Sequence, residues 1–264
     1  MKDISIQDLK RLQTLILRDV ALFCEQEKIS YFLAYGTALG AVRHQGFIPW
    51  DDDIDIMMPR PDYERFLSLF NKKHQSYYYV YSFPADDNYS LPFAKVGDTR
   101  TEMFEYLYKK ENFGVYIDIF PLDGLQGRTQ IRLMKLLNMF LNTKKALLGR
   151  HRSLLKNFLI ILGKIILFAV SKRSILKKMN SISNSISYEK ASNVCVLCST
   201  TAEREIFDKR LFADFVNIPF ENYQFRVPSN YDQYLKQCYG DYMTLPSEEE
   251  RQSTHLFKAW WKEL

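Results

Sequence analysis

The chain has 264 residues, of which 47% are hydrophobic and 25% charged, and its formal net charge at pH 7 is +5. This apolar content is enough for a sizeable core, and the absence of repeats, low-complexity tracts and linkers rich in proline or glycine argues against an array or a disordered chain. Four dispersed cysteines, and an N-terminal stretch without an apolar signal core, predict a cytoplasmic protein with reduced thiols.

The first predicted element is a helix over residues 6–28. Ser5 and Asp8 form a helix-capping pattern, and apolar side chains then recur at helical spacing. A short strand over residues 31–34 leads into a turn at Gly36-Thr37, and a helix start over residues 38–43 follows. The amides of such a turn can point at a phosphate.

Four aspartates in five positions follow that helix: Asp51, Asp52, Asp53 and Asp55. Carboxylates so close repel one another unless a cation lies among them. Asp51, Asp53 and Asp55 alternate, so an extended strand would place all three on one face. Such oxygen ligands suit Mg²⁺ or Mn²⁺ with a bound phosphate, whereas Asp52 is expected to point away and to be structural or solvated.

A solvated loop and a calcium-binding loop fit the acidic cluster less well. A solvated loop is the commonest context for such a run, but the Ile-Asp-Ile alternation favours a half-buried strand over residues 54–58, where an unpartnered carboxylate is costly. A calcium loop does not fit, because Ile56 occupies the position that needs glycine and Asp62 the position that needs glutamate.

The remaining elements are predicted from turn residues and apolar runs. In chain order they are a helix over 62–71, strands over 77–82, 93–96 and 115–120, strands over 212–215 and 225–227, and a helix from Ser229 to about Tyr239. Cys195 and Cys198 have metal-type spacing, but no second Cys/His pair completes a zinc site, so an apolar strand is expected there.

Residues 128–190 have a helical pattern and a one-sided charge. No Asp or Glu occurs from Gly124 to Tyr188, whereas this segment holds 13 Lys and Arg, which leaves the rest of the chain at −8. Its most apolar part, residues 154–170, is interrupted by Lys156 and Lys164 and is too short to span a membrane, which takes about 20 apolar residues. Both a core helix and an interfacial helix on an anionic membrane surface fit this pattern.

Three blocks of the sequence carry a family resemblance. Gly36-Thr37 followed by Asp53-Ile54-Asp55-Ile56 resembles the nucleotidyltransferase superfamily, and the run over residues 46–56 resembles the LicD family of bacterial phosphocholine transferases. Fukutin-related protein, a CDP-ribitol-dependent polyol-phosphate transferase, shares that core. Residues 114–124 resemble the family's third-aspartate strand. Residues 239–246, with Arg251 and His255, resemble its C-terminal block.

This resemblance implies an α+β fold: a nucleotidyltransferase-like mixed β-sheet core with flanking helices and a basic helical insertion at residues 128–190, all in one catalytic unit over residues 1–264. It implies that Asp53, Asp55 and Asp118 are catalytic residues and ligands of Mg²⁺ or Mn²⁺, with Asp51 as an outer ligand or the partner of a basic residue. Asp118 would also accept the proton of the acceptor hydroxyl. The residues expected to bind substrate are Gly36, Thr37, Arg43, His44, Trp50, Lys95, Asp241 and His255, with Arg100 as a further phosphate candidate.

The implied function is transfer of a phospho-alcohol from a CDP-linked donor, with CDP-choline favoured, onto a hydroxyl of a lipid-linked glycan acceptor. That acceptor would be a precursor of lipopolysaccharide, teichoic acid or capsule. CDP-ribitol or CDP-glycerol as donor, and a true nucleotidyltransferase that releases pyrophosphate, are the alternatives. No nucleic-acid partner is expected, because the basic segment is apolar and lacks a recognition motif. We expect a cytoplasmic enzyme, peripheral at the inner face of the cell membrane.

Overall fold

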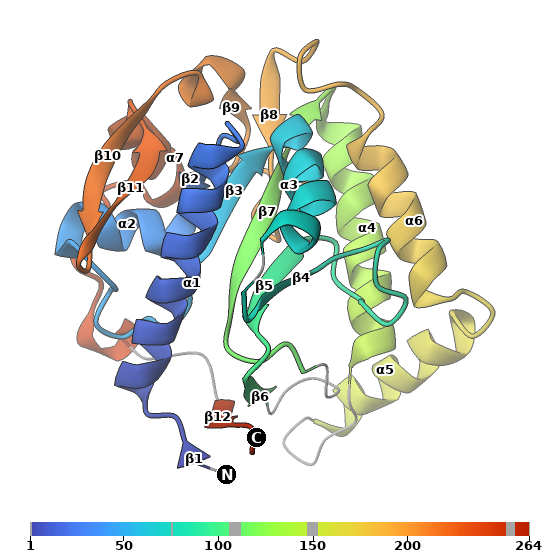
Figure 1. Cartoon of the computed structure of the whole chain (residues 1–264). Coiled ribbons are helices and arrows are strands. Elements are labelled where there is room, and N and C mark those ends of the chain that lie inside the picture. The colour runs from blue at the N-terminus through green and yellow to red at the C-terminus, as the bar shows by residue number, and fades with distance from the viewer. Residues whose placement is uncertain (1, 75, 106–111, 147–152, 252–256, 264) are drawn as a thin grey trace.

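The computed structural model describes residues 2–74, 76–105, 112–146, 153–251 and 257–263. Its centre is a mixed sheet in the order β2-β3-β7-β5-β4, shown with its flanking helices in Figure 1. The strands are β2 (Phe32–Leu33), β3 (Asp55–Pro59), β7 (Tyr116–Leu125), β5 (Ala94–Asp98) and β4 (Tyr78–Tyr81). β3 and β7 are parallel and the other neighbours antiparallel, so the predicted α+β fold with a mixed sheet is confirmed.

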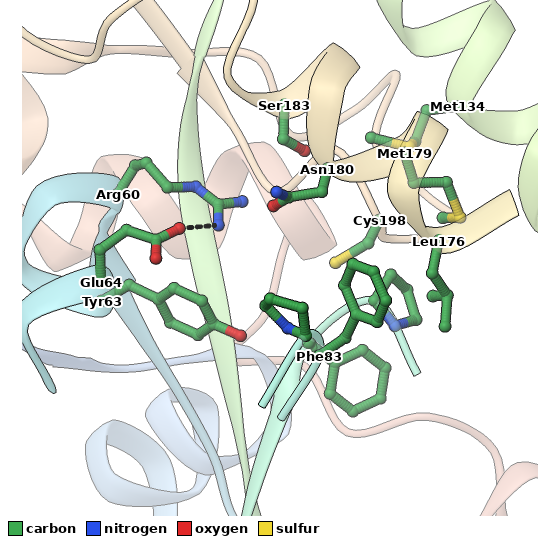
Figure 2. A pocket seen from close by; sticks show the side chains of 13 residues that line it. Arg60, Tyr63, Glu64, Phe83, Met134, Leu176, Met179, Asn180, Ser183 and Cys198 are labelled. Atoms are coloured by element: carbon green, nitrogen blue, oxygen red, sulfur yellow. Dashed lines mark hydrogen bonds and ion pairs between the residues drawn. The ribbon is translucent and has the colours of Figure 1, made fainter. Parts of the chain in front are cut away.

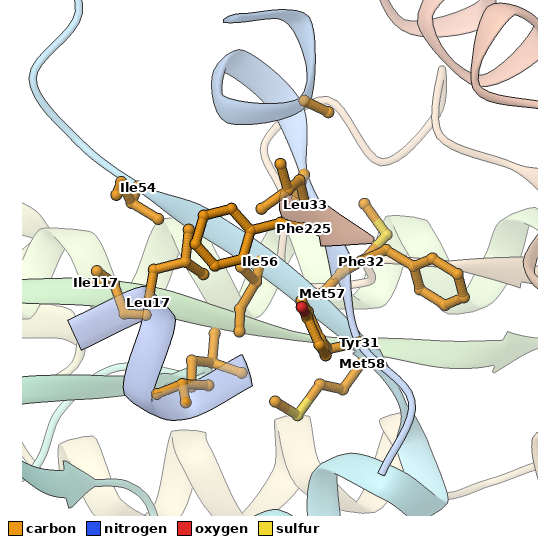
Figure 3. Packing of buried hydrophobic residues seen from close by; sticks show 14 of the residues in the cluster. Leu17, Tyr31, Phe32, Leu33, Ile54, Ile56, Met57, Met58, Ile117 and Phe225 are labelled. Atoms are coloured by element: carbon orange, nitrogen blue, oxygen red, sulfur yellow. The ribbon is translucent and has the colours of Figure 1, made fainter. Parts of the chain in front are cut away.

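Two helices pack against the sheet and bury its apolar side. α1 (Ile6–Gln26) begins where the Ser5 hydroxyl accepts the Asp8 amide at 3.1 Å, as the capping pattern predicts, and α3 (Arg60–Lys73) follows β3 directly. Figure 3 shows the core beneath them, where Leu17 of α1 lies against Ile56 and Ile117 of the sheet. Burial of these aliphatic side chains stabilises the fold by about 1.5–3 kcal/mol each.

The opposite flank carries α2 (Tyr35–His44), a hairpin and α7 (Tyr231–Tyr239). The hairpin is made of β10 (Phe215–Phe220) and β11 (Tyr223–Pro228). A three-stranded sheet joins β1 (Lys2–Asp3), β12 (Phe257–Trp261) and β6 (Thr101–Glu105). The shorter elements are β8 (Asn193–Cys195), β9 (Phe207–Asp208) and the 3-10 helices η1 (Lys209–Phe212) and η2 (Glu248–Glu250).

The basic segment forms three helices: α4 (Arg128–Lys145), α5 (Leu154–Ile166) and α6 (Lys172–Ser183). α4 and α6 pack side by side and share a second apolar cluster with β8, which includes Met134, Met179 and Cys195. Cys195 is thus in a buried strand, as expected, and no described group of His, Cys, Asp and Glu side chains is arranged to hold zinc there. None of the described helices is both long and apolar enough to cross a bilayer.

Several predicted boundaries need correction. Residues 212–215 are not a strand: η1 ends at Phe212, and β10 begins only at Phe215. The Asp208 side chain accepts the Arg210 amide and so favours a helical turn over an extended start. Gly36-Thr37 is the first turn of α2 rather than a separate turn. β3 begins at Asp55, so Asp51 and Asp53 lie in the preceding loop and not on the strand.

Candidate functional site

Backbone register places three charged side chains in one row across three neighbouring strands. Asp55 of β3 is paired with Asp118 of β7, and Asp118 is paired with Lys95 of β5. Paired residues of adjacent strands project from the same face of a sheet. The row therefore brings two of the predicted catalytic aspartates and one predicted phosphate-binding lysine together.

The charged form of Asp55 is disfavoured by its surroundings. Its pKa is raised well above the usual value, first by burial and then by the carboxylates of Asp53, Asp118 and Asp51, while Lys95 lowers it. The Asp55 amide donates to the Thr37 hydroxyl at 2.8 Å, which ties the strand to the start of α2. The structure thus gathers all four predicted aspartates around one point, although two of them come from a loop.

The start of α2 lies close to the loop that holds Asp51 and Asp53. A Cβ atom on Gly36 would lie 2.5 Å from the Oδ2 atom of Asp51, so this carboxylate occupies the space that a larger residue needs. The first amides of a helix have no intrahelical acceptor, which leaves those of Gly36 and Thr37 on the side of the aspartates. This end of the helix fits a bound phosphate group.

Lys95 is held in place by both charge and aromatic contact. Its Nζ atom lies 2.6 Å from the Oδ1 atom of Asp118 and 3.4 Å from the centre of the Tyr116 ring. The lysine side chain is only 7% exposed, so this ion pair is shielded from water. Lys95 therefore fixes the orientation of Asp118 and supplies a positive charge within the carboxylate cluster.

Four half-buried rings lie beside the charged row, and we call them the aromatic wall: Tyr35, Phe93, Tyr116 and Phe120. Phe93 and Phe120 have ring centres 4.5 Å apart, and Tyr35 meets Phe120 edge-on at 5.5 Å. The Lys95 ammonium lies 5.5 Å from the Phe93 ring. Ring faces of this kind attract cations, including quaternary ammonium groups.

The N-terminal motif and the C-terminal block meet at Arg43. Its Nη1 atom donates to the Tyr242 carbonyl at 2.7 Å, and its Nε atom donates to His44 Nε2 at 3.0 Å. The pKa of His44 is lowered, first by burial and then by the charge of Arg43. Trp50 contacts the His44 ring on one side and the Arg251 guanidinium, 5.7 Å from its ring, on the other.

Two predicted residues are not brought to the aspartates. Asp241 is exposed on a turn, where it accepts the Thr244 hydroxyl at 2.7 Å. Arg100 is engaged by Asp98 at 2.5 Å and covers the Tyr77 ring, so its role in this structure is structural. His255 lies outside the described residues.

Sequence reasoning missed two tyrosines at this site. The pKa of Tyr239 is raised, first by burial and then by Cys238, Asp55 and Asp51, so its phenol lies near the aspartates. Tyr35 has a positive φ of 46°, which is strained for a bulky residue. Tyr239 lies within the C-terminal block that resembles the family, but no feature distinguished it there. Tyr35 carried no signal, because its strained conformation depends on contacts distant in sequence.

Tyr35 keeps this strained conformation through contacts from the C-terminal half. Its amide donates to the Tyr234 hydroxyl at 3.0 Å, and its own hydroxyl donates to Glu205 at 2.7 Å. Glu205 is 2% exposed and also accepts hydroxyls of Ser199 and Thr201. This buried network sets the residue immediately before Gly36, and strain of this kind is concentrated at functional sites.

A separate small pocket opens where α3 begins, between α3, the 83–93 loop, α4 and α6. Figure 2 shows the Arg60–Glu64 ion pair on one side of it and Phe83, Leu176 and Met179 on the other. Phe93 of the aromatic wall is among the residues that line it. The pocket therefore adjoins the aromatic wall without containing the aspartates.

The donor atoms near Asp55 suit a hard divalent cation, because all four aspartates offer oxygen ligands and their mutual repulsion falls when a cation binds. Among the described residues, however, no three His, Cys, Asp or Glu side chains form a ready-made metal-binding group. The residues fit the metal in their chemistry, and their oxygens would have to move closer together to bind one ion.

Comparison with known proteins identifies a family for this chain. Residues 28–136 match the family model described as the LicD/FKTN/FKRP nucleotidyltransferase domain. The chain is similar to the lipopolysaccharide cholinephosphotransferase LicD of Haemophilus influenzae, with 31% identity over 271 aligned positions that cover 98% of this chain and 99% of that protein. It is also similar to an uncharacterised protein of Rickettsia typhi, with 28% identity over 109 residues that cover 41% of this chain and 33% of that protein.

Proposed function

The chain belongs to the LicD family, and from this we propose that it transfers phosphocholine from CDP-choline to a hydroxyl of a cell-surface glycan precursor. The observation that supports this proposal is the row of Asp55, Asp118 and Lys95, which offers carboxylates and a fixed cation on one face of the sheet. The similar Haemophilus protein is named for lipopolysaccharide, which makes a lipopolysaccharide precursor the first acceptor to test. A teichoic acid or capsule precursor is the alternative.

We infer that Asp53, Asp55 and Asp118, with Asp51, would hold Mg²⁺ or Mn²⁺. The bound ion would neutralise the donor diphosphate and stabilise the charge that develops during in-line displacement. The protein's own part is positioning. The amides of Gly36 and Thr37 would donate to the phosphates, Tyr239 would border the carboxylates, and Arg43, held by the Tyr242 carbonyl, would supply a further positive charge.

In this proposal Asp118 accepts the proton of the acceptor hydroxyl. Its ion pair with Lys95 fixes the direction of the carboxylate, which favours the orientation needed for general-base catalysis. The hydroxyl oxygen then forms a bond to the distal phosphorus, the bond from that phosphorus to the bridging oxygen breaks, and CMP leaves with the bonding electrons. The products are the phosphocholine ester and CMP.

The aromatic wall supports choline as the donor alcohol. A trimethylammonium group has no hydrogen-bond donors and is recognised by ring faces. Tyr35, Phe93 and Phe120 supply such rings within contact of one another and beside the catalytic row. Ribitol and glycerol carry hydroxyls instead, so their recognition depends on hydrogen bonds rather than on these rings.

Product analysis tests the proposal. Purified protein is incubated with Mg²⁺, an acceptor glycan precursor and CDP-choline, CDP-ribitol or CDP-glycerol in turn. We expect CMP release and acceptor modification with CDP-choline. Preference for another CDP-alcohol would move the assignment to a polyol-phosphate transferase, and pyrophosphate release from a nucleoside triphosphate would identify a nucleotidyltransferase.

We also propose that the reaction takes place at the cytoplasmic face of the cell membrane, where lipid-linked acceptors are held. The support is the excess of cations and lack of acids between Gly124 and Tyr188.

A further inference from the structure

α5 is folded with its apolar side outward. Figure 1 shows it across one end of the α4 and α6 pair. Asn157, Gly163 and Lys164 are only partly exposed and mark the side toward the protein. The large side chains on the remaining surface are all exposed: Leu155, Phe158, Leu159, Ile161, Leu162, Ile165 and Ile166 of the helix, and Phe168 and Val170 just after it.

This exposure excludes α5 as an ordinary core helix. Ile166 is 72% exposed and Phe168 87% exposed, whereas a helix on a protein surface normally turns its polar side to water. The second apolar cluster is built from α4, α6 and neighbouring strands, and the described α5 residues do not contribute to it. An exposed apolar patch of this size marks a site of interaction with another protein or with a membrane.

The orientation of α5 is fixed by two contacts with α4. A Cβ atom on Gly163 would lie 2.7 Å from the Cγ2 atom of Thr143, so the two helices are packed as closely as glycine allows. The Lys144 ammonium donates to the Leu167 carbonyl at 2.8 Å and caps the end of α5. The apolar side therefore faces outward because the other side is packed, and it is not left exposed by a loose helix.

The charges beside the exposed apolar residues favour a membrane as the partner of this surface. Exposed Leu133, Leu136 and Met139 form a stripe on α4 that leads toward Thr143, and the exposed Arg132 lies on the same side of that helix by its helical position. Lys156 is exposed on α5 itself, and the whole segment contains no acid. Exposed apolar side chains flanked by the exposed cations Arg132 and Lys156 fit the headgroup region of an anionic bilayer.

We infer that α5 and the Leu133–Met139 stripe of α4 form a docking surface for an anionic lipid membrane, with α5 parallel to the bilayer plane. At 13 residues the helix is about 20 Å long, shorter than the hydrocarbon core of about 30 Å. This inference rests on the proposed function only in one respect: docking would bring the enzyme to a lipid-linked acceptor. Membrane binding itself involves no turnover.

Vesicle flotation tests the inference. The full chain is mixed with vesicles of phosphatidylcholine alone or of phosphatidylcholine with phosphatidylglycerol, at low and at physiological salt. We expect flotation with the anionic vesicles, weakened by salt. Replacing Arg132 and Lys156 by Gln should weaken binding about five-fold for each cation, the factor that corresponds to about 1 kcal/mol.

The apolar contribution is tested with a triple variant, Phe158→Ser, Ile166→Ser and Phe168→Ser. These side chains are exposed, so the variant should keep its thermal unfolding midpoint and lose flotation. The matched control is Ile6→Ser, Leu22→Ser and Tyr79→Ser, which removes three side chains that are also exposed, between 44% and 48%, but lie elsewhere. The control should float like the unmodified protein.

Two outcomes would overturn the inference. Unmodified protein that stays at the bottom of the gradient with anionic vesicles at low salt does not dock to such a membrane. Protein that is dimeric by sedimentation, becomes monomeric in the α5 variant and never floats uses α5 to bind a second copy. Neither result depends on transferase activity, so the proposed reaction would remain to be judged by its own products.

Discussion

Asp55 shows at the scale of one residue how a site can oppose the stability of its own fold. Its raised pKa means that the ionised carboxylate is disfavoured in the folded, metal-free protein. Asp55→Asn removes a proposed metal ligand and should abolish turnover, yet it should raise the unfolding midpoint in EDTA because one of the mutually repelling carboxylates is gone. Thermal unfolding in EDTA measures the higher midpoint of the variant. Thermal unfolding with Mg²⁺ shows whether the variant has lost stabilisation by the metal.

The control for Asp55→Asn is Asp214→Asn, which replaces an exposed carboxylate and should change neither activity nor stability. Full turnover in excess EDTA, or a stable and active Asp55→Asn enzyme, would argue against a metal-dependent site.

Asp118 and Lys95 should differ in what their replacement does. Asp118→Asn removes the proposed base, so kcat should fall by about 100-fold or more with donor binding less affected. Lys95→Gln leaves the carboxylate in place but no longer fixes it, because the ion pair at 2.6 Å is lost. We expect kcat to fall in both variants and an acceptor with a more acidic hydroxyl to rescue Asp118→Asn more than Lys95→Gln. Near-normal turnover of Asp118→Asn would leave Asp118 a structural residue.

Phe93 tests the aromatic wall separately from the chemistry. It stacks against Phe120, and Phe93→Leu keeps most of the apolar volume while removing the ring face. KM for CDP-choline should rise by about 5- to 30-fold, the range expected for loss of a desolvated cation–π contact of about 1–2 kcal/mol. Leu91→Val is a nearby control. Equal effects of Phe93→Leu on CDP-choline and CDP-glycerol would show that Phe93 serves packing alone.

At the scale of elements, the packing of α2 depends on a glycine. A Cβ atom on Gly40 would overlap the Gly46 carbonyl oxygen, which is backbone and cannot rotate away, whereas Gly127 has no atom within 4 Å of that position. Gly40→Ala should therefore cost about 1–3 kcal/mol and displace the turn that leads to Asp51. Gly127→Ala should be close to neutral. Chemical denaturation compares the two, and equal midpoints would contradict this account.

Much of the fold could be predicted from local pattern. The helix over 6–28, the strand over 115–120 and the helical segment over 128–190 correspond to α1, β7 and the α4–α6 layer, because each has a long and consistent period. The strand over 212–215 was wrong because a single Asp208 side-chain contact decides the local conformation. Short pairs such as β8 with β9 depend on partners in space, so their sequences carry little signal.

The candidate site was partly predictable for the same reason. Asp53, Asp55 and Asp118 carry a motif, and the structure adds the register that joins Asp55 to Asp118. Tyr35 and Tyr239 could not be found, because their environment is made by residues on distant parts of the chain. The direction in which α5 faces was also undetermined, since core and interfacial helices share one apolar period.

At the scale of the whole molecule, one buried ion pair links the sheet to α3. Arg60 bonds to Asp123 at 2.6 Å, and burial raises the pKa of Asp123 from 3.8 to about 6. Between these two values the folded state retains a proton that the unfolded state has lost, so this group lowers stability as pH rises from about 4 to about 6. The loss amounts to about 3 kcal/mol.

Asp123→Asn cannot titrate and should lack that decline. Denaturation of both proteins from pH 4 to pH 7 isolates the contribution, because the other carboxylates titrate alike in each. The unmodified protein should lose stability relative to the variant as pH rises. Parallel curves would mean that Asp123 has an ordinary pKa. Removal of the carboxylate also leaves Arg60 with Glu64 as its remaining ion-pair partner, so the variant is expected to be less stable overall.

The pairing of Asp55 with Asp118 also determines where the chain can gain or lose residues. Side chains alternate between the two faces of a strand, so the position of each aspartate along its strand decides that it faces the site. A deletion of one residue within β3 or β7 would turn the side chains that follow to the opposite face. The same deletion at residues 85–88, in the connection between β4 and β5, leaves the alternation of side chains within the strands unchanged. Natural length variation among related chains should therefore collect in the loops and stay out of Asp55–Pro59 and Tyr116–Leu122.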